Sequence, residues 1–133
     1  MPDVEVLAEA PIYPTEDPER VRRALENILP GAELEVRGEG PVRVLVARAR
    51  GREALSKLRA MVRMERISDA FRAALLAGLR PWGLEFYLNK QAAYARRLSL
   101  SEPKGESPLG PIRIEVRCPD PEGLVDWLAP RTG

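Results

Sequence analysis

Arginines at helical spacing are the side chains of this sequence most suited to binding a ligand. Arg59, Arg63 and Arg66 recur at positions i, i+4 and i+7, which places them along one stripe of a helix. Guanidinium groups make planar, bidentate contacts with phosphate, and each such contact adds to a salt-dependent affinity for nucleic acids. Residues 50–80 contain 8 basic and 3 acidic residues, although the net charge of the whole chain is only +1. The stripe therefore predicts a phosphate-binding helix, and the alternative is a solvated face whose arginines pair with neighbouring acidic side chains.

A second polar cluster lies between two tyrosines. Asn89-Lys90-Gln91 has the composition of a turn between strands, with Tyr87 and Tyr94 on either side and Arg96-Arg97 behind them. Amides and a cation can contact base edges, and aromatic rings can stack on bases. Turns on rigid scaffolds often bind ligands, but a hairpin turn needs no further function. Lys90 as a catalytic nucleophile would need burial and a lowered pKa, and the sequence indicates neither.

Composition excludes several kinds of catalytic and metal site. The chain has no histidine and one cysteine, Cys118, so Cys–His and Ser–His pairs, an intramolecular disulfide and a cysteine-based zinc cluster are excluded. The acidic pairs Glu33/Glu35 and Glu16/Asp17 could ligate a hard cation, but no loop has the spacing of a metal site. We therefore expect no metal and no cofactor, and we favour a protein that is not an enzyme.

Hydrophobic periodicity places these residues in an α+β domain. Alternating apolar residues predict strands over residues 4–12, 33–37, 42–48, 84–88 and 112–117. Apolar residues at helical spacing predict helices over 17–29, 52–79 and 120–129, with a bend near 64–67 in the second. Residues 92–100 suit a helix or a strand, and their last leucines favour a strand. With 44% apolar residues to form a core, we expect a single domain over residues 1–133, a mainly antiparallel sheet with the helices packed on it.

The tripeptide Asp-Pro-Glu occurs twice, each time before an apolar helical pattern. Asp17 and Asp120 both precede a proline, which disfavours the α conformation for the aspartate and suits the first helical position. Each aspartate is therefore expected to cap a helix. The repeated order of strand, Asp-Pro-Glu and helix is typical either of a pseudo-repeat or of the same capping chemistry used twice.

No targeting or membrane segment is evident in the sequence. No apolar run approaches the roughly 20 residues that span a bilayer, and the acidic N-terminus lacks the basic and apolar pattern of a signal peptide. We expect a cytoplasmic protein with no membrane partner. The chain is arginine-rich, with 18 arginines against 3 lysines, which also fits surface ion-pair networks in a hot habitat.

Four short stretches span nearly the whole chain: Pro14–Pro18, Phe86–Ala93, Pro108–Ile112 and Asp126–Pro130. Together and in this order they are similar to the signatures of an archaeal family of uncharacterised proteins to which RNA binding is ascribed. The resemblance implies an α+β fold with an antiparallel sheet, like that of the large-subunit ribosomal protein that carries 5S RNA. It implies no catalytic residues.

The leading hypothesis is that the domain binds structured RNA or a ribonucleoprotein. Phosphate contacts are then expected from Arg59, Arg63, Arg66, Lys90, Arg96 and Arg97, and finer recognition from Tyr87, Asn89 and Gln91. One alternative is a protein-interaction or homodimeric scaffold that uses the sheet. The other is a small-molecule binder or enzyme centred on Lys90, Gln91 and Tyr94. A basic groove would favour RNA, a flat apolar sheet face the scaffold, and a pocket beside residues 89–91 the small-molecule binder.

Overall fold

An antiparallel sheet organises the molecule. In the computed structural model, which describes residues 3–102 and 110–131, six strands form one sheet. They are β1 (Glu5–Ile12), β2 (Glu33–Arg37), β3 (Arg43–Arg50), β4 (Leu79–Arg80), β5 (Gly83–Leu88) and β6 (Ile112–Arg117). The order across the sheet is β2-β3-β1-β6-β5-β4, and every pairing is antiparallel. The expected antiparallel sheet is confirmed.

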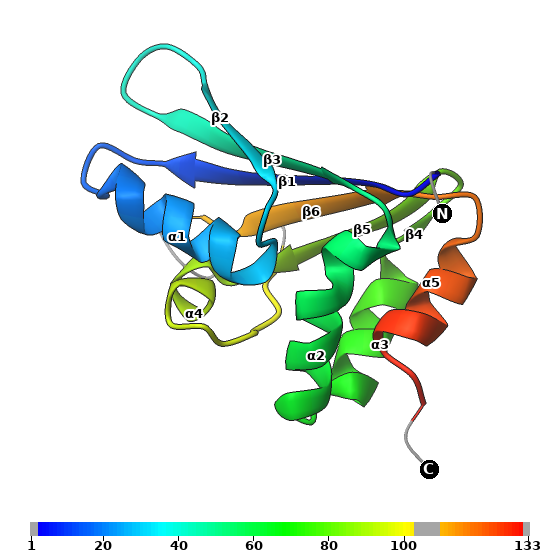
Figure 1. Cartoon of the computed structure of the whole chain (residues 1–133). Helices are drawn as coiled ribbons and strands as arrows, with labels where there is room; N and C mark the ends of the chain where they lie inside the picture. Colours follow the sequence, from blue (N-terminus) through cyan, green and yellow to red (C-terminus); the bar gives the residue numbers. More distant parts are fainter. Residues whose placement is uncertain (1–2, 103–109, 132–133) are drawn as a thin grey trace.

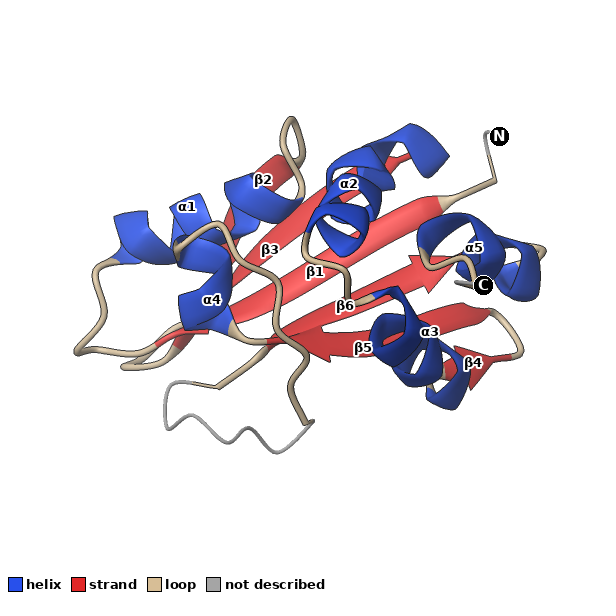
Figure 2. Ribbon diagram, turned by 90° about the horizontal axis from the view of Figure 1, so that it is seen from below, coloured by secondary structure: helices blue, strands red, loops and turns tan. Residues whose placement is uncertain are grey.

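The helices lie together on one face of this sheet, as Figures 1 and 2 show. They are α1 (Pro18–Ile28), α2 (Ser56–Met64), α3 (Ser68–Ala77), α4 (Lys90–Tyr94) and α5 (Pro121–Leu128), with a short 3-10 helix, η1 (Arg52–Leu55), before α2. Within the described residues, no helix is long and apolar enough to cross a bilayer. The sheet and the helices on it make a two-layer α+β structure, as expected, and none of the described helices lies over the second face of the sheet.

The core lies between the two layers and follows from the alternation of the strands. Ala8, Ala10 and Ile12 of β1 point toward the helices and are at most 2% exposed. Phe71 of α3 meets Phe86 of β5 edge to face, with ring centroids 5.5 Å apart. Because successive strand side chains point to opposite faces, the residues between these apolar ones line the face without helices.

Both Asp-Pro-Glu sequences begin a helix in the expected way. The Asp17 carboxylate accepts a hydrogen bond from the backbone N–H of Glu19 at 3.0 Å, at the start of α1. The Asp120 carboxylate accepts one from the N–H of Gly123, also at 3.0 Å, at the start of α5. The prediction of two aspartate caps is confirmed.

The expected strand over residues 92–100 is wrong, and so is the hairpin turn before it. Asn89 begins α4, and its side-chain oxygen caps that helix by accepting a hydrogen bond from the N–H of Ala92 at 2.8 Å. Leu100 then meets β5 through an isolated bridge to Leu88. A helix of 5 residues is too short to display a helical period in the sequence. Without that period, Asn89 was interpreted as a turn residue and not as a helix cap.

Candidate functional site

The expected bend in the long helical region is present, and an arginine forms it. Arg66 lies in the break between α2 and α3 and has a φ of 55°, in the left-handed region. Its N–H donates to the carbonyl of Arg63, and the N–H of Ile67 donates to the carbonyl of Val62, both at 3.2 Å. These two bonds define the Schellman motif, in which the left-handed position is usually glycine.

The helix α4 ends in the same motif. Arg96 has a φ of 62°, its N–H donates to the carbonyl of Ala93 at 3.0 Å, and the N–H of Arg97 donates to the carbonyl of Ala92 at 2.8 Å. Arg66 and Arg96 are the non-glycine residues with positive φ among those that the structure describes. A side chain in this conformation costs roughly 1–2 kcal/mol. Strained backbone concentrates at functional positions, so both arginines are candidates for a functional role.

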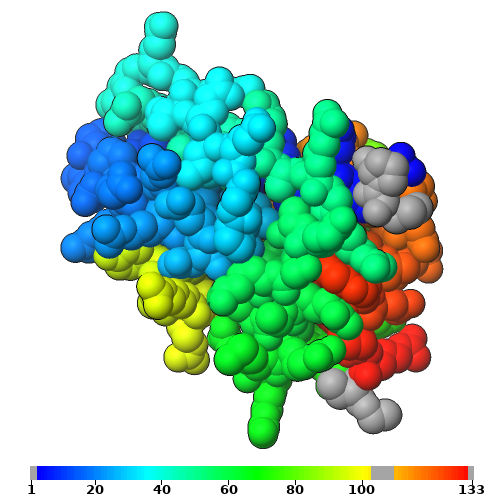
Figure 3. All heavy atoms as spheres, viewed as in Figure 1, coloured from blue at the N-terminus to red at the C-terminus, as the bar shows by residue number. Residues whose placement is uncertain are grey.

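Glu65 joins these two helix ends. Its carboxylate accepts hydrogen bonds from the N–H of Leu98 at 3.0 Å and from Nε of Arg97 at 3.4 Å. The surface of α2 consequently lies beside that of the segment around α4, green and yellow in Figure 3. Arg63, Arg66, Arg96 and Arg97 are all exposed, and we call them the arginine surface. It unites side chains about 30 positions apart in the sequence, which sequence spacing alone cannot reveal.

The predicted stripe also lines a cavity at the end of α2. Arg59, Arg63 and Arg66 all border a hollow of about 380 Å³ that reaches α5 at Leu128. Arg59 differs from the other two because its Nε donates to the carbonyl of Trp127 at 2.9 Å and its guanidinium lies 5.0 Å from the centre of that ring. Arg59 therefore also fastens α2 to α5, whereas Arg63 and Arg66 project into solvent.

Lys90 is buried, contrary to the expectation of a surface cation in a turn. Only 4% of its side chain is exposed. Its ammonium group donates to both carboxylate oxygens of Glu16, at 2.8 and 3.0 Å, and to the carbonyl of Pro11 at 2.7 Å. Burial lowers the pKa of Lys90, and the hydrogen bonds and charge of Glu16 oppose that shift. With three donors and three acceptors, this ammonium group holds α4 against the start of α1 and is not placed to contact a phosphate on the surface.

The other predicted recognition residues are separated by the fold. Asn89 uses its side chain as a helix cap. Tyr87 alternates with the buried Phe86 in β5, lies on the face without helices, and donates its hydroxyl to Glu85 at 2.9 Å. Gln91 is exposed on the helical side. The structure therefore does not bring Tyr87 and Gln91 together.

A second cavity, of about 370 Å³, lies between α1 and α4. Its lining residues are Thr15, Glu16, Asp17, Arg20, Val21, Lys90, Gln91 and Tyr94. Asn27 of α1 joins the same two helices by donating from its amide to the carbonyls of Ala93 and Tyr94, at 2.9 and 3.2 Å. Two of the stretches that carried the family resemblance, residues 14–18 and 86–93, thus meet at one hollow. A pocket beside residues 89–91 was the feature expected of a small-molecule binder, and this hollow is lined by Lys90 and Gln91.

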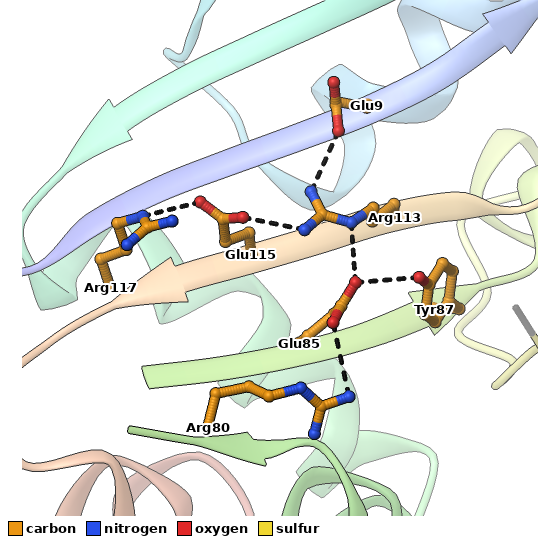
Figure 4. A network of polar contacts seen from close by, with 7 residues as sticks. All are labelled: Glu9, Arg80, Glu85, Tyr87, Arg113, Glu115 and Arg117. Atoms are coloured by element: carbon orange, nitrogen blue, oxygen red, sulfur yellow. Dashed lines mark hydrogen bonds and ion pairs between the residues drawn. The ribbon is translucent and has the colours of Figure 1, made fainter. Parts of the chain in front are cut away.

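The face without helices carries an ion-pair network centred on Arg113 (Figure 4). Its guanidinium group contacts Glu9 at 3.0 Å and Glu85 and Glu115 at 2.8 Å. Burial raises the pKa of both Glu85 and Glu115, but hydrogen bonds and charges of neighbouring cations outweigh it and hold both pKa values below the ordinary one. Burial lowers the pKa of Arg113, and its carboxylate partners outweigh that too, so the pKa is raised.

The arginine content suggested surface ion-pair networks but not their place, and the position of this network bears on two earlier expectations. A charged face is unlike the flat apolar face that a scaffold would favour. Glu35, one of the acidic residues considered for cation binding, instead pairs with Arg37 and Arg48, each at 3.3 Å. Among the described residues, no group of three or more acidic or cysteine side chains could hold a metal ion.

Comparison with known proteins shows the family to which this chain belongs. Residues 5–118 match a family model described as RNA binding. The chain belongs to that family. It is 44% identical over 128 residues to the UPF0201 protein TK1335 of Thermococcus kodakarensis, covering 96% of this chain and 91% of the relative. It is 38% identical over 130 residues to the UPF0201 protein of Aeropyrum pernix, covering 97% and 87%.

A solved structure supports the fold. The UPF0201 protein from Methanococcus jannaschii superposes with a TM-score of 0.84 at 29% identity, covering 97% of this chain and 95% of that one. The predicted resemblance to an archaeal family is therefore confirmed, whereas the likeness to the ribosomal protein stays a prediction. Of the stretches that suggested the family, Pro108 and Leu109 lie outside the described residues.

Proposed function

We propose that this protein binds RNA, alone or within a ribonucleoprotein, and that the arginine surface contacts the phosphates. The observation that supports this most strongly is the pair of left-handed arginines, Arg66 and Arg96, which lie on two segments that the Glu65 carboxylate joins. At both chain reversals the left-handed position, which is usually glycine, is occupied by an arginine. Arg63 and Arg97 extend the same positive surface, and the family model described as RNA binding is consistent with it.

The competing explanation is that these arginines only stabilise helix ends. The C-terminus of a helix is negative, and a cation there contributes about 0.3–1 kcal/mol. That gain is smaller than the roughly 1–2 kcal/mol that a left-handed side chain costs. Glycine would add unfolded-state entropy of roughly 0.5–1 kcal/mol, which brings the two sides of this balance close together, so binding measurements on glycine variants are needed to separate the explanations.

The left-handed positions allow an unusually clean test, because glycine removes the charge and suits the backbone. We expect the double variant Arg66→Gly/Arg96→Gly to remain folded and to bind a labelled, mixed-sequence RNA single strand more weakly. Each phosphate contact contributes roughly 0.7 to the slope of log affinity against log salt. Loss of two contacts should therefore flatten that slope by about 1.4, as measured by fluorescence anisotropy between low and moderate salt.

A matched control removes two arginines from a different region. Arg37→Gln/Arg43→Gln alters β2 and β3, where both side chains are exposed, and should leave the slope almost unchanged. If both double variants flatten the slope equally, the binding depends on net charge and the arginine surface is not the site. If the wild-type protein shows no salt-dependent binding at about 50 mM salt, the low end of the range where such contacts are strong, the RNA proposal is wrong.

A further inference from the structure

The cavity between α1 and α4 has the size and lining of a small-ligand site. Its volume of about 370 Å³ lies at the lower end of the roughly 300–1,000 Å³ of small-molecule pockets. The ring of Tyr94 and the side chain of Val21 contribute apolar walls, and Glu16, Gln91 and Thr15 contribute polar groups. Such a mixture suits a flat, polar-edged ring better than a compact ion.

We propose that this cavity receives a nucleobase. When that base belongs to an RNA strand, the inference rests on the proposed function and adds to it a preference for unpaired nucleotides. An aromatic ring is a sequence-tolerant platform for a base. Tyr94 is exposed to 37%, and the guanidinium of Arg20 lies 5.5 Å from the centre of its ring. Ring and guanidinium therefore give the lining of the cavity two flat, exposed groups.

Glu16 gives the cavity a preference among bases. Its carboxylate is held by Lys90 and by the N–H of Tyr13, which donates at 3.0 Å. An ionised carboxylate has about four acceptor directions, and these contacts use three of them. The remaining direction suits an amino group on a base edge, as when a glutamate accepts from the N4 amino group of cytosine. Cytidine should therefore bind more tightly than uridine, which has a carbonyl oxygen at that position.

The cavity and the arginine surface belong to one continuous element. α4 supplies Lys90, Gln91 and Tyr94 to the cavity, and Arg96 and Arg97 follow directly. The five residues of α4 rise roughly 7 Å, whereas nucleotides in a stacked strand are spaced roughly 3.4 Å apart. A base in the cavity would thus place the phosphates one or two nucleotides away next to the arginine surface.

The test compares two RNA hexamers with equal charge. One is oligouridine, and the other is the same hexamer with cytidine at its two central positions. We expect the wild-type protein to bind the cytidine-containing hexamer at least about fivefold more tightly. Tyr94→Ala should weaken its binding about 5- to 150-fold, the range expected from base–aromatic stacking, and Tyr94→Phe should retain the wild-type affinity.

A measurement on the wild-type protein avoids any dependence on how the variants fold. Free cytidine at millimolar concentration should shift the backbone amide NMR signals of Thr15, Asp17 and Gln91, and uridine should shift them less.

If the nucleoside produces these shifts but neither hexamer binds, the cavity takes a free nucleoside and the RNA proposal is wrong. If both hexamers bind equally with salt dependence and Tyr94→Ala has no effect, the cavity proposal is wrong and the arginine surface stands. If neither nucleoside nor hexamer binds, both proposals are wrong.

Discussion

At the scale of single residues, surroundings decide which cations are available for binding. Lys90 and Arg66 both lie in basic stretches that suggested phosphate contacts. Lys90 is enclosed and has a carboxylate and a carbonyl as partners, so its charge supports the fold. Arg66 projects from a strained chain reversal into solvent, so its charge faces outward. Only the second is placed to meet a phosphate.

Lys90→Met should be strongly destabilising. It would leave the carboxylate of Glu16, whose side chain is 11% exposed, without its cation. Removal of one partner of a buried ion pair costs about 3–5 kcal/mol, so urea denaturation should show a decrease of that order in the free energy of unfolding. The double variant Lys90→Met/Glu16→Gln should recover part of the loss, because no charge is left unpaired. A decrease below about 1 kcal/mol in the single variant would show that the pair is not buried as described.

At the scale of elements, two helix ends position the candidate site. α2 and α4 both terminate in a Schellman motif, and Glu65, the C-cap residue of α2, binds the chain that leaves α4. Helix termination thus does two things at once. It reverses the chain, and it directs the arginines of two separate segments to one surface.

Substitutions at Arg66 should rank by their tolerance of the left-handed conformation. Arg66→Gly relieves the steric cost of the side chain but adds unfolded-state entropy of roughly 0.5–1 kcal/mol. It also removes a cation worth about 0.3–1 kcal/mol at the helix C-terminus, so we expect the free energy of unfolding to stay within about 1 kcal/mol of the wild-type value. Arg66→Asn should be close to wild type, since asparagine also adopts this conformation. Arg66→Val should be the least stable of the series in thermal denaturation, because branching at Cβ disfavours positive φ.

At the scale of the whole molecule, the two faces of the sheet have different tasks. One face buries the core beneath the helices, and the other is covered by charged side chains paired with one another. In that network Glu85 and Glu115 face each other on neighbouring strands. Like charges in this arrangement are destabilising, and the guanidinium of Arg113 between them compensates.

Acid should therefore weaken the fold in a defined window. Glu85 and Glu115 have folded-state pKa values below the ordinary 4.5. Their contribution to stability is complete above that pH and is lost as the pH falls through the lowered values. Urea denaturation as a function of pH should show a declining free energy of unfolding below about pH 4.5.

Arg113→Met tests the origin of that decline. We expect it to lower stability at neutral pH by about 2 kcal/mol, the usual size for hydrogen bonds to charged groups, and to make the decline in acid shallower. Arg48→Met on the same face, whose arginine side chain is 49% exposed, should change stability by less than about 1 kcal/mol. An acid decline as steep in Arg113→Met as in the wild type would assign the effect to other carboxylates.

Local patterns in the sequence determined much of this architecture. The alternation in residues 112–117, the helical period in 52–79 and the two Asp-Pro caps depend on neighbours within one turn or one strand, so these elements and the bend could be predicted. The stripe of Arg59, Arg63 and Arg66 was predictable for the same reason, since a helix brings together residues three and four positions apart.

Tertiary structure alone decided what those elements do together. The burial of Lys90 depends on Glu16, 74 positions away, and the arginine surface depends on Glu65 reaching Leu98, 33 positions away. Contacts at such separations leave no period in the sequence. The short helix α4 was missed because its stability comes from its cap at Asn89 and its packing on α1 at Asn27, and tertiary packing of that kind overrides local propensity.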